Sequence, residues 1–68
     1  MDWRVIVGKN IRRLREEREL TQEKLAVDSE IDLTYLGGIE RGKRNPSLLV
    51  IVRIAEALGA TPAELVTP

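Results

Sequence analysis

The stretch that decides the fold is TQEKLAVDSEIDLTYLGGIERGKRN, which runs from Thr21 to Asn45. Thr21 is a natural N-cap for a short helix from Gln22 to about Asp28, since its hydroxyl can accept an otherwise unpaired backbone N–H. Asp32 can cap another helix that ends just ahead of Gly42, a good left-handed residue at a helix C-terminus. The segment therefore predicts two short helices joined by a tight turn and followed by a basic loop.

Three further helices are expected around these two, which makes the chain an all-α, five-helix domain of residues 1–68. The first runs from about Trp3 to Arg18. The fourth, Leu48 to Leu58 with Ser47 as its N-cap, is apolar around most of its circumference and so belongs at the centre. Residues 61–64, TPAE, have the form of a capping box that starts a last, short helix. The apolar stripe of the first helix comprises Trp3, Val7, Ile11 and Leu14.

Composition excludes several kinds of site. The chain has no cysteine and no histidine, so disulfides, thiolate or imidazole metal sites and histidine-based catalysis are ruled out. No nucleophile–base pairing is visible, and an enzyme is the weakest interpretation; we expect no catalytic residue, metal, cofactor or small-molecule substrate. No apolar run approaches the roughly 20 residues that span a bilayer, and no signal peptide is visible, which predicts a cytosolic protein without membrane association.

The charges balance overall but are segregated along the chain. Eleven basic and eleven acidic side chains give a net charge of zero, which by itself argues against a nucleic-acid binder. Residues 3–15 nevertheless hold five cations and no acid, whereas residues 16–32 hold seven acids and two cations. Three more cations follow within residues 41–44. This pattern predicts a dipolar surface with one positive edge, with ordinary solvated helix faces as the alternative.

Three motifs, TQEKLA at 21–26, TYLGGIERG at 34–42 and RNPS at 44–47, resemble the XRE-type helix-turn-helix family. That family includes phage repressors and Cro proteins of the lambda class and the controller proteins of restriction–modification systems. The resemblance covers about residues 7–66. It implies a compact lambda-repressor-like domain whose second and third helices form a helix-turn-helix. It also implies a bacterial or phage-type transcriptional regulator, a repressor or autoregulatory controller, that binds a palindromic double-stranded DNA operator as a homodimer and is nucleoid-associated when bound.

Family positions can be carried over to this chain residue by residue. The resemblance implies that Leu33, Thr34 and Gly38 face base edges, where Thr34 can use its hydroxyl or pack its methyl on a thymine methyl. It assigns phosphate contacts to Gln22, Tyr35, Arg41, Lys43, Arg44 and Asn45. We therefore expect Lys43→Ala and Arg44→Ala to weaken binding to all sequences similarly, and Thr34→Ala to change discrimination among them.

Arg15 and Glu40 match a pair that the family uses as an internal salt bridge between its first and third helices. Both residues lie at the edges of their apolar stripes, which supports a structural role independently of the resemblance. We expect the pair to stabilise the fold rather than to contact DNA.

The chain departs from the family pattern in the turn and on the third helix. Glu30 stands where the turn normally has glycine, and a positive φ there would cost a non-glycine residue about 1–2 kcal/mol. Leu33 occupies a position that is often polar or basic in the family, and it can offer a base only apolar contact. Gly37 and Gly38 interrupt a helix at about 1 kcal/mol each. They indicate either a backbone pressed close to DNA or a tight contact between helices.

A second functional class stays open. The same fold could serve as a protein-interaction module, such as an antitoxin or anti-regulator. Leu49, Leu65 and Val66 are predicted to be exposed apolar residues that form either the homodimer interface, which we favour, or a partner site. A DNA reader needs the outer face of its third helix open and ringed by cations, and Thr34 and Arg41 on that face favour DNA.

Overall fold

Each of five helices begins at a side chain that caps it. The computed structural model describes all 68 residues and has helices α1 (Trp3–Glu17), α2 (Gln22–Ser29), α3 (Leu33–Glu40), α4 (Leu48–Leu58) and α5 (Pro62–Leu65). The side chains of Thr21, Asp32, Ser47 and Thr61 each accept a hydrogen bond from a backbone N–H of the helix that follows. These four predicted caps are confirmed, and Asp2 caps α1 in the same way.

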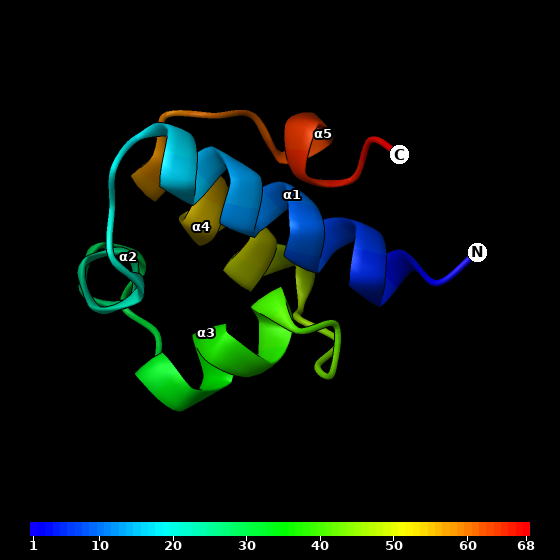
Figure 1. Ribbon diagram of the computed structural model, residues 1–68, viewed down its shortest axis with the longest axis horizontal. Helices are drawn as coiled ribbons and strands as arrows, with labels where there is room; N and C mark the ends of the chain where they lie inside the picture. The colour runs from blue at the N-terminus through cyan, green and yellow to red at the C-terminus, as the bar shows by residue number, and fades with distance from the viewer.

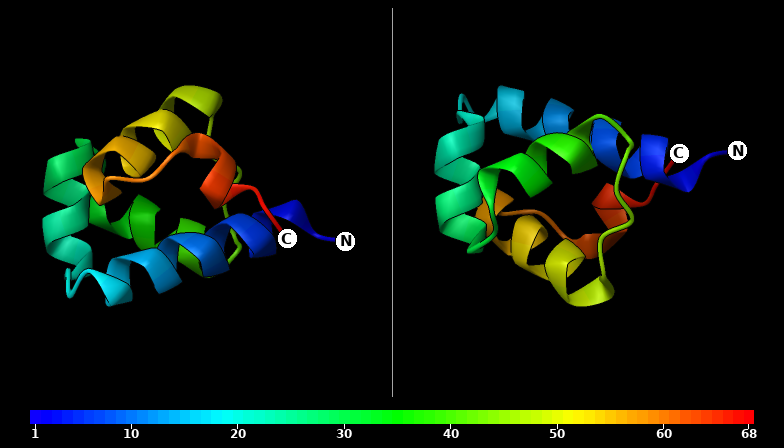
Figure 2. Two further views of the ribbon diagram at one scale, coloured as in Figure 1. Left: turned by 90° about the horizontal axis from the view of Figure 1, so that it is seen from above. Right: turned by 90° about the horizontal axis from the view of Figure 1, so that it is seen from below.

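The helices enclose one core between α1 and α4. Figure 1 shows α1 above α3, with α5 on the other side of α1 and α2 seen end-on at the end of the molecule away from the chain termini. In the turned views of Figure 2, α2 closes one end and both termini lie at the other. α3 packs on α1 and α2, and α4 packs on α2 and α5. α3 is therefore fixed along one side of the molecule by its neighbours.

The core is aliphatic and draws on every helix. Trp3 was expected to share the apolar stripe of α1; it lines the same surface hollow as Val7, but its side chain is 52% exposed and does not join the buried core. It lies in the first turn of α1, at the terminal end of the molecule, where fewer elements cover the helix (Figure 2). The buried apolar residues are Val7, Ile11, Leu14, Leu25, Ala26, Leu36, Ile39, Ile51, Ile54, Ala55, Leu58 and Leu65.

A glycine in α1 sets how closely α3 approaches it. A Cβ atom on Gly8 would overlap the carbonyl oxygen of Ile39 and would lie 2.8 Å from that of Glu40. The backbones of the two helices therefore touch at this point, and no side chain fits between them. The contact holds the C-terminal end of α3, and with it Glu40, against α1.

The turn between α2 and α3 has the left-handed backbone that the family pattern predicted. Glu30 adopts φ 57° and ψ 44°, and its N–H donates to the α2 carbonyl of Val27. Glu19 is a second non-glycine residue with positive φ, 56°, which the sequence did not indicate. None of the five helices combines the length and the apolar surface that crossing a bilayer requires.

Candidate nucleic-acid interface

The N-terminal turn of α3 is open to solvent on one side. Leu36 and Ile39 are fully buried and fix the inner face of the helix against the core. Leu33, 42% exposed, and Thr34 lie on the other side, while Tyr35 is half-buried beside them. Two of the three residues predicted to face bases are thus accessible at the start of this helix.

The paired glycines of α3 lie beneath arginine side chains. A Cβ atom on Gly37 would lie 3.1 Å from Nη1 of Arg41, and one on Gly38 would lie 2.8 Å from Cγ of Arg44. Both glycines are buried as a result. No other helix lies against either glycine, so the sequence-based alternative of a tight contact between helices is wrong, while close approach of the α3 backbone to DNA stays a prediction. The base contact predicted for Gly38 therefore requires Arg44 to move.

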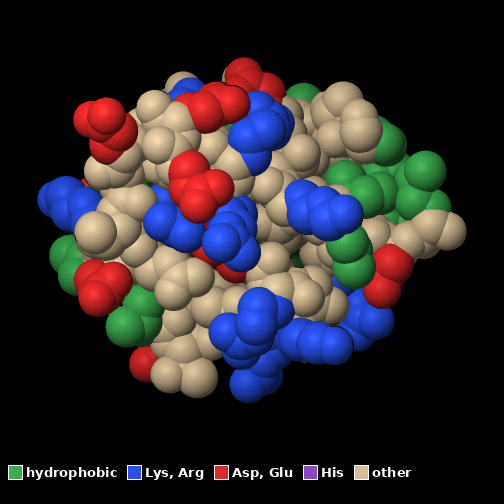
Figure 3. Space-filling view, viewed as in Figure 1, with side chains coloured by type: hydrophobic (Ala, Val, Ile, Leu, Met, Phe, Trp, Pro, Cys, Tyr) green, Lys and Arg blue, Asp and Glu red, His purple; other side chains and the backbone are tan.

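Cationic side chains gather beside the C-terminal end of α3. Arg41, Lys43, Arg44 and Asn45 are all exposed. Figure 3 shows Lys and Arg side chains clustered along the lower edge of the molecule, over the end of α3 and the loop that follows it. The guanidinium carbon of Arg44 lies 5.8 Å from the centre of the Tyr35 ring, within range of a cation–π interaction. A neutral chain thus has a positive edge at the C-terminal end of α3, from which Arg44 reaches back to Tyr35 beside the exposed N-terminal turn.

A buried ion pair connects α1 to α3, as predicted. Arg15 donates from Nε to Oε2 of Glu40 at 2.8 Å and from Nη2 to Oε1 at 3.1 Å. Its third contact, from Nη1 to the carbonyl oxygen of Leu20 at 2.8 Å, reaches the chain between α1 and α2. The two side chains are 12% and 2% exposed. The hydrogen bonds to Glu40 raise the pKa of Arg15 more than its partial burial lowers it, so the guanidinium stays charged across the neutral range.

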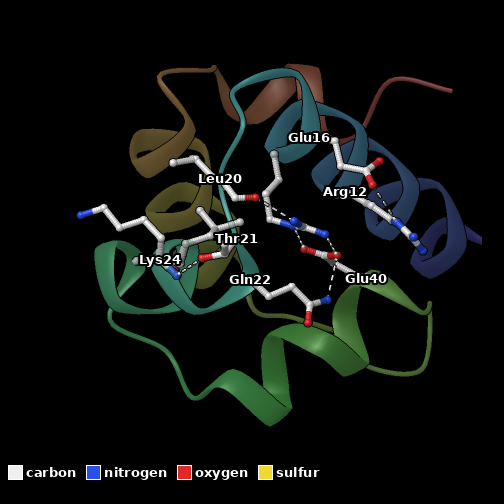
Figure 4. A network of polar contacts seen from close by, with 10 residues as sticks. Arg12, Glu16, Leu20, Thr21, Gln22, Lys24 and Glu40 are labelled. Carbon is white, nitrogen blue, oxygen red and sulfur yellow. Dashed lines mark hydrogen bonds and ion pairs between the residues drawn. The ribbon is translucent and has the colours of Figure 1, made fainter.

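Gln22 joins the same pair from α2. Its Nε2 donates to Oε1 of Glu40 at 3.0 Å, and Figure 4 shows the amide turned toward that carboxylate. Sequence reasoning assigned Gln22 to a phosphate, and in this structure one of its two amide protons is taken by Glu40. The contact joins side chains on different helices, so no local sequence pattern could have revealed it.

The match to known proteins falls on these same elements. The family model described as helix-turn-helix matches residues 11–65. The chain belongs to the helix-turn-helix family. α2 and α3, joined by the turn at Glu30, are its helix-turn-helix, in a lambda-repressor-like arrangement of five helices.

Relatives along nearly the whole chain are regulators. The HTH-type transcriptional regulator y4dJ of Sinorhizobium fredii is 47% identical over 68 residues, which cover 100% of this chain and 88% of y4dJ. The control protein C.BamHI of Bacillus amyloliquefaciens is 41% identical over 63 residues, 91% of this chain and 78% of that protein. The crystal structure of the restriction–modification controller protein C.AhdI from Aeromonas hydrophila superposes with a TM-score of 0.89 at 47% identity, covering 91% of this chain and 94% of that one.

Membership in this family makes the protein a DNA-binding transcriptional regulator, and the family is one of regulators rather than enzymes. Nothing in these relatives favours the alternative of a protein-interaction module.

One of the three residues predicted to form the dimer surface is not exposed. Leu49 and Val66 are exposed, at 70% and 43%, but Leu65 is completely buried and is not available to a second subunit. In a helix of four residues one side must face the core, and here that side is Leu65. Leu48, 74% exposed, and Trp3 are apolar surface residues that the prediction did not include.

Proposed function

We propose that the protein binds a palindromic operator as a homodimer and controls transcription from it, as a repressor or autoregulatory controller, in the bacterial cytoplasm. In each subunit the N-terminal turn of α3 enters the major groove. The observation that carries the proposal is the exposure of Leu33 and Thr34 on α3 next to the cations of residues 41–44. An accessible helix face flanked by cations is what a major-groove reader requires.

Thr34 is the direct base contact in this proposal, and Leu33 packs on the apolar part of a base pair such as a thymine methyl. Arg41, Lys43 and Asn45 lie at the positive edge, where they meet phosphates on either side of the groove. The first turn of α4 offers further backbone N–H groups to phosphate. The N–H of Val50 is not one of them, because it donates to the Ser47 hydroxyl. Together these contacts fix the register of α3 while Thr34 reads the sequence.

A homodimer is supported by the apolar residues at the terminal end of the molecule. Trp3 and Val66 line a shallow hollow of about 170 Å³ with Val7, Pro46 and Ile51, and Arg4 and Asn45 complete its lining. Figure 3 shows apolar side chains on that side of the molecule. If a two-fold axis passes near this surface, two copies of α3 address half-sites about one turn of duplex apart, ~34 Å.

The test is selection of bound duplexes from a random pool at fixed salt, followed by affinity measurements at several salt concentrations. We expect a two-fold symmetric consensus, and a linear fall of log affinity with log salt by about 0.9 for each phosphate contacted. Thr34→Ala should change the preferred base at one position in each half-site. A pool that shows no enrichment, with the protein folded, would contradict the proposal.

A further inference from the structure

We propose that Arg44 reads a base in the major groove, rather than binding a phosphate, and that Gly38 and Tyr35 form the seat that aims it. This rests on the proposed function, because it assigns a role within the contact between α3 and DNA. It also changes the role that the sequence predicted for Arg44, which was grouped there with the phosphate-binding cations of its loop.

The first part of the seat is the bare Cα atom of Gly38. A Cβ atom at that position would lie 2.8 Å from Cγ, 3.4 Å from Nε and 3.7 Å from Cδ of Arg44. The aliphatic stem of Arg44 therefore lies flat along the backbone of α3. Any other residue at position 38 would occupy the space that the stem fills.

The second part of the seat is the ring of Tyr35. Tyr35 precedes Gly38 by three residues, so it lies about one helical turn closer to the N-terminus of α3. The Arg44 guanidinium carbon is 5.8 Å from the centre of this ring. The side chain thus starts in the loop, crosses Gly38 and carries its charge back toward the turn where Leu33 and Thr34 are exposed.

The loop backbone is fixed to the same point of the helix. The N–H of Lys43 donates to the carbonyl oxygen of Gly38 at 2.9 Å, which holds the residue next to Arg44 against α3. The side chain of Lys43 is exposed and takes part in none of the ion pairs of the structure. Lys43 is therefore free to contact a phosphate. Its neighbour Arg44 extends along α3 instead.

The exposed turn of α3 has few side chains of its own that can form hydrogen bonds with bases. Leu33 occupies a base-facing position but has no hydrogen-bonding group, which leaves Thr34, next to the half-buried Tyr35, as the one exposed polar side chain in the first turn of α3. An arginine can donate two hydrogen bonds to O6 and N7 of guanine, the commonest specific contact in the major groove. Arg44 would supply the discrimination for guanine that Leu33 cannot.

The test compares affinities for the selected operator and for single-base variants of it, at one salt concentration. Arg44→Ala should reduce discrimination at one guanine in each half-site by roughly 10-fold or more, and leave the preference at other positions unchanged. Gly38→Ala should cause the same loss, because its methyl group displaces the Arg44 stem. The double variant should discriminate no worse than Arg44→Ala alone, which separates displacement of Arg44 from a contact made by Gly38 itself.

Two matched controls distinguish the seat from a general effect on the helix. Gly37→Ala introduces the same methyl group one residue earlier, where it meets only the mobile tip of Arg41, and should keep the guanine preference. Tyr35→Phe keeps the ring: loss of the hydroxyl, which was predicted to contact a phosphate, should weaken all duplexes similarly and leave the guanine preference in place, whereas Tyr35→Leu should lose that preference. The melting temperature of each variant shows that it is folded.

If Arg44→Ala instead weakens every duplex by the same factor and reduces the salt slope by about one phosphate, Arg44 is a phosphate contact and the inference is overturned. The same holds if Gly38→Ala reduces discrimination further in the Arg44→Ala background. Failure of the unmodified protein to select any sequence would overturn the proposed function, and the inference with it.

Discussion

At the scale of single residues, the carboxylate of Glu40 accepts three hydrogen bonds, two from Arg15 and one from Gln22. The three donor atoms belong to Arg15 on α1 and Gln22 on α2, so one side chain on α3 holds three helices together. Glu30 illustrates the opposite case, because its backbone conformation costs free energy and its side chain points into solvent. Both residues lie outside the exposed turn of α3. Substituting them should therefore change the free energy of unfolding before it changes DNA binding.

Glu40→Ala should lower the free energy of unfolding by about 3–5 kcal/mol, because it leaves the charge of Arg15 without its partner in a site that water scarcely reaches. Urea denaturation measures the change. Glu17→Ala is the matched control, since Glu17 pairs with Arg13 across side chains that are about half exposed, at 54% and 53%. That variant should lose at most about 0.5 kcal/mol. If the two variants lose the same free energy of unfolding, the buried ion pair does not stabilise the fold more than an exposed one.

Glu30→Gly should raise the free energy of unfolding by about 1 kcal/mol. Glycine removes the left-handed strain of about 1–2 kcal/mol, and its greater freedom in the unfolded chain offsets part of that gain. Glu30→Ala keeps a Cβ atom at the same φ and should give no gain, which separates backbone strain from loss of the charge. A decrease in the midpoint of thermal unfolding for Glu30→Gly would refute the strained-turn explanation.

At the scale of helices, α1 and α3 meet backbone to backbone at Gly8, and this contact orients the whole recognition helix. A methyl group at Gly8 cannot be accommodated by rotating a side chain, because the atoms that it meets belong to the α3 backbone. The two helices would have to separate at the end that holds Glu40. The contact therefore links packing in the core to the position of α3.

Gly8→Ala should lower the free energy of unfolding by about 1–2 kcal/mol, since overpacking of about 2–3 kcal/mol against an α3 backbone outweighs the gain of about 1 kcal/mol in helix propensity. Gly59→Ala is the control, because a Cβ atom there meets nothing within 4 Å and only the left-handed φ of 67° is unfavourable. Denaturation of the two variants side by side gives the comparison. If Gly8→Ala is no less stable than Gly59→Ala, the close approach of α1 and α3 does not constrain the fold.

The helices could be predicted because their caps are local. Thr21, Asp32, Ser47 and Thr61 each act within three residues, and α4 begins and ends where its pattern indicated. The contacts that cross between helices could not be predicted. No local pattern marks Gly8 as the contact point with α3, and nothing in the sequence placed Arg44 over Gly38. The burial of Leu65 depends on which side of a four-residue helix meets α1 and α4, which periodicity cannot define over so short a span.

At the scale of the whole molecule, the distribution of surface groups matters more than their sum. Net charge is zero, yet the cations of the loop after α3 form a positive edge (Figure 3). Apolar side chains lie exposed at the terminal end, away from α2. In the proposed function, the positive edge meets DNA and the apolar surface meets a second subunit.

Leu49→Glu should leave the fold intact, since the side chain is 70% exposed, but should weaken the homodimer by placing like charges at the interface. Sedimentation equilibrium should give a higher dimer dissociation constant, and affinity for a two-half-site duplex should fall with it. Val27→Glu is the matched control, because Val27 is 72% exposed on α2 at the other end of the molecule. Unchanged dimerisation of Leu49→Glu would place the interface elsewhere.

The central claim is that the exposed side of α3 and the loop after it form the surface that meets DNA. The most direct measurement is titration of a selected duplex into ¹⁵N-labelled protein, with the backbone amide shifts followed residue by residue. We expect the largest shifts at Leu33, Thr34 and residues 41–45, with saturation at two chains per duplex. Large shifts confined to α1 and α5, with residues 33–45 unchanged, would contradict it.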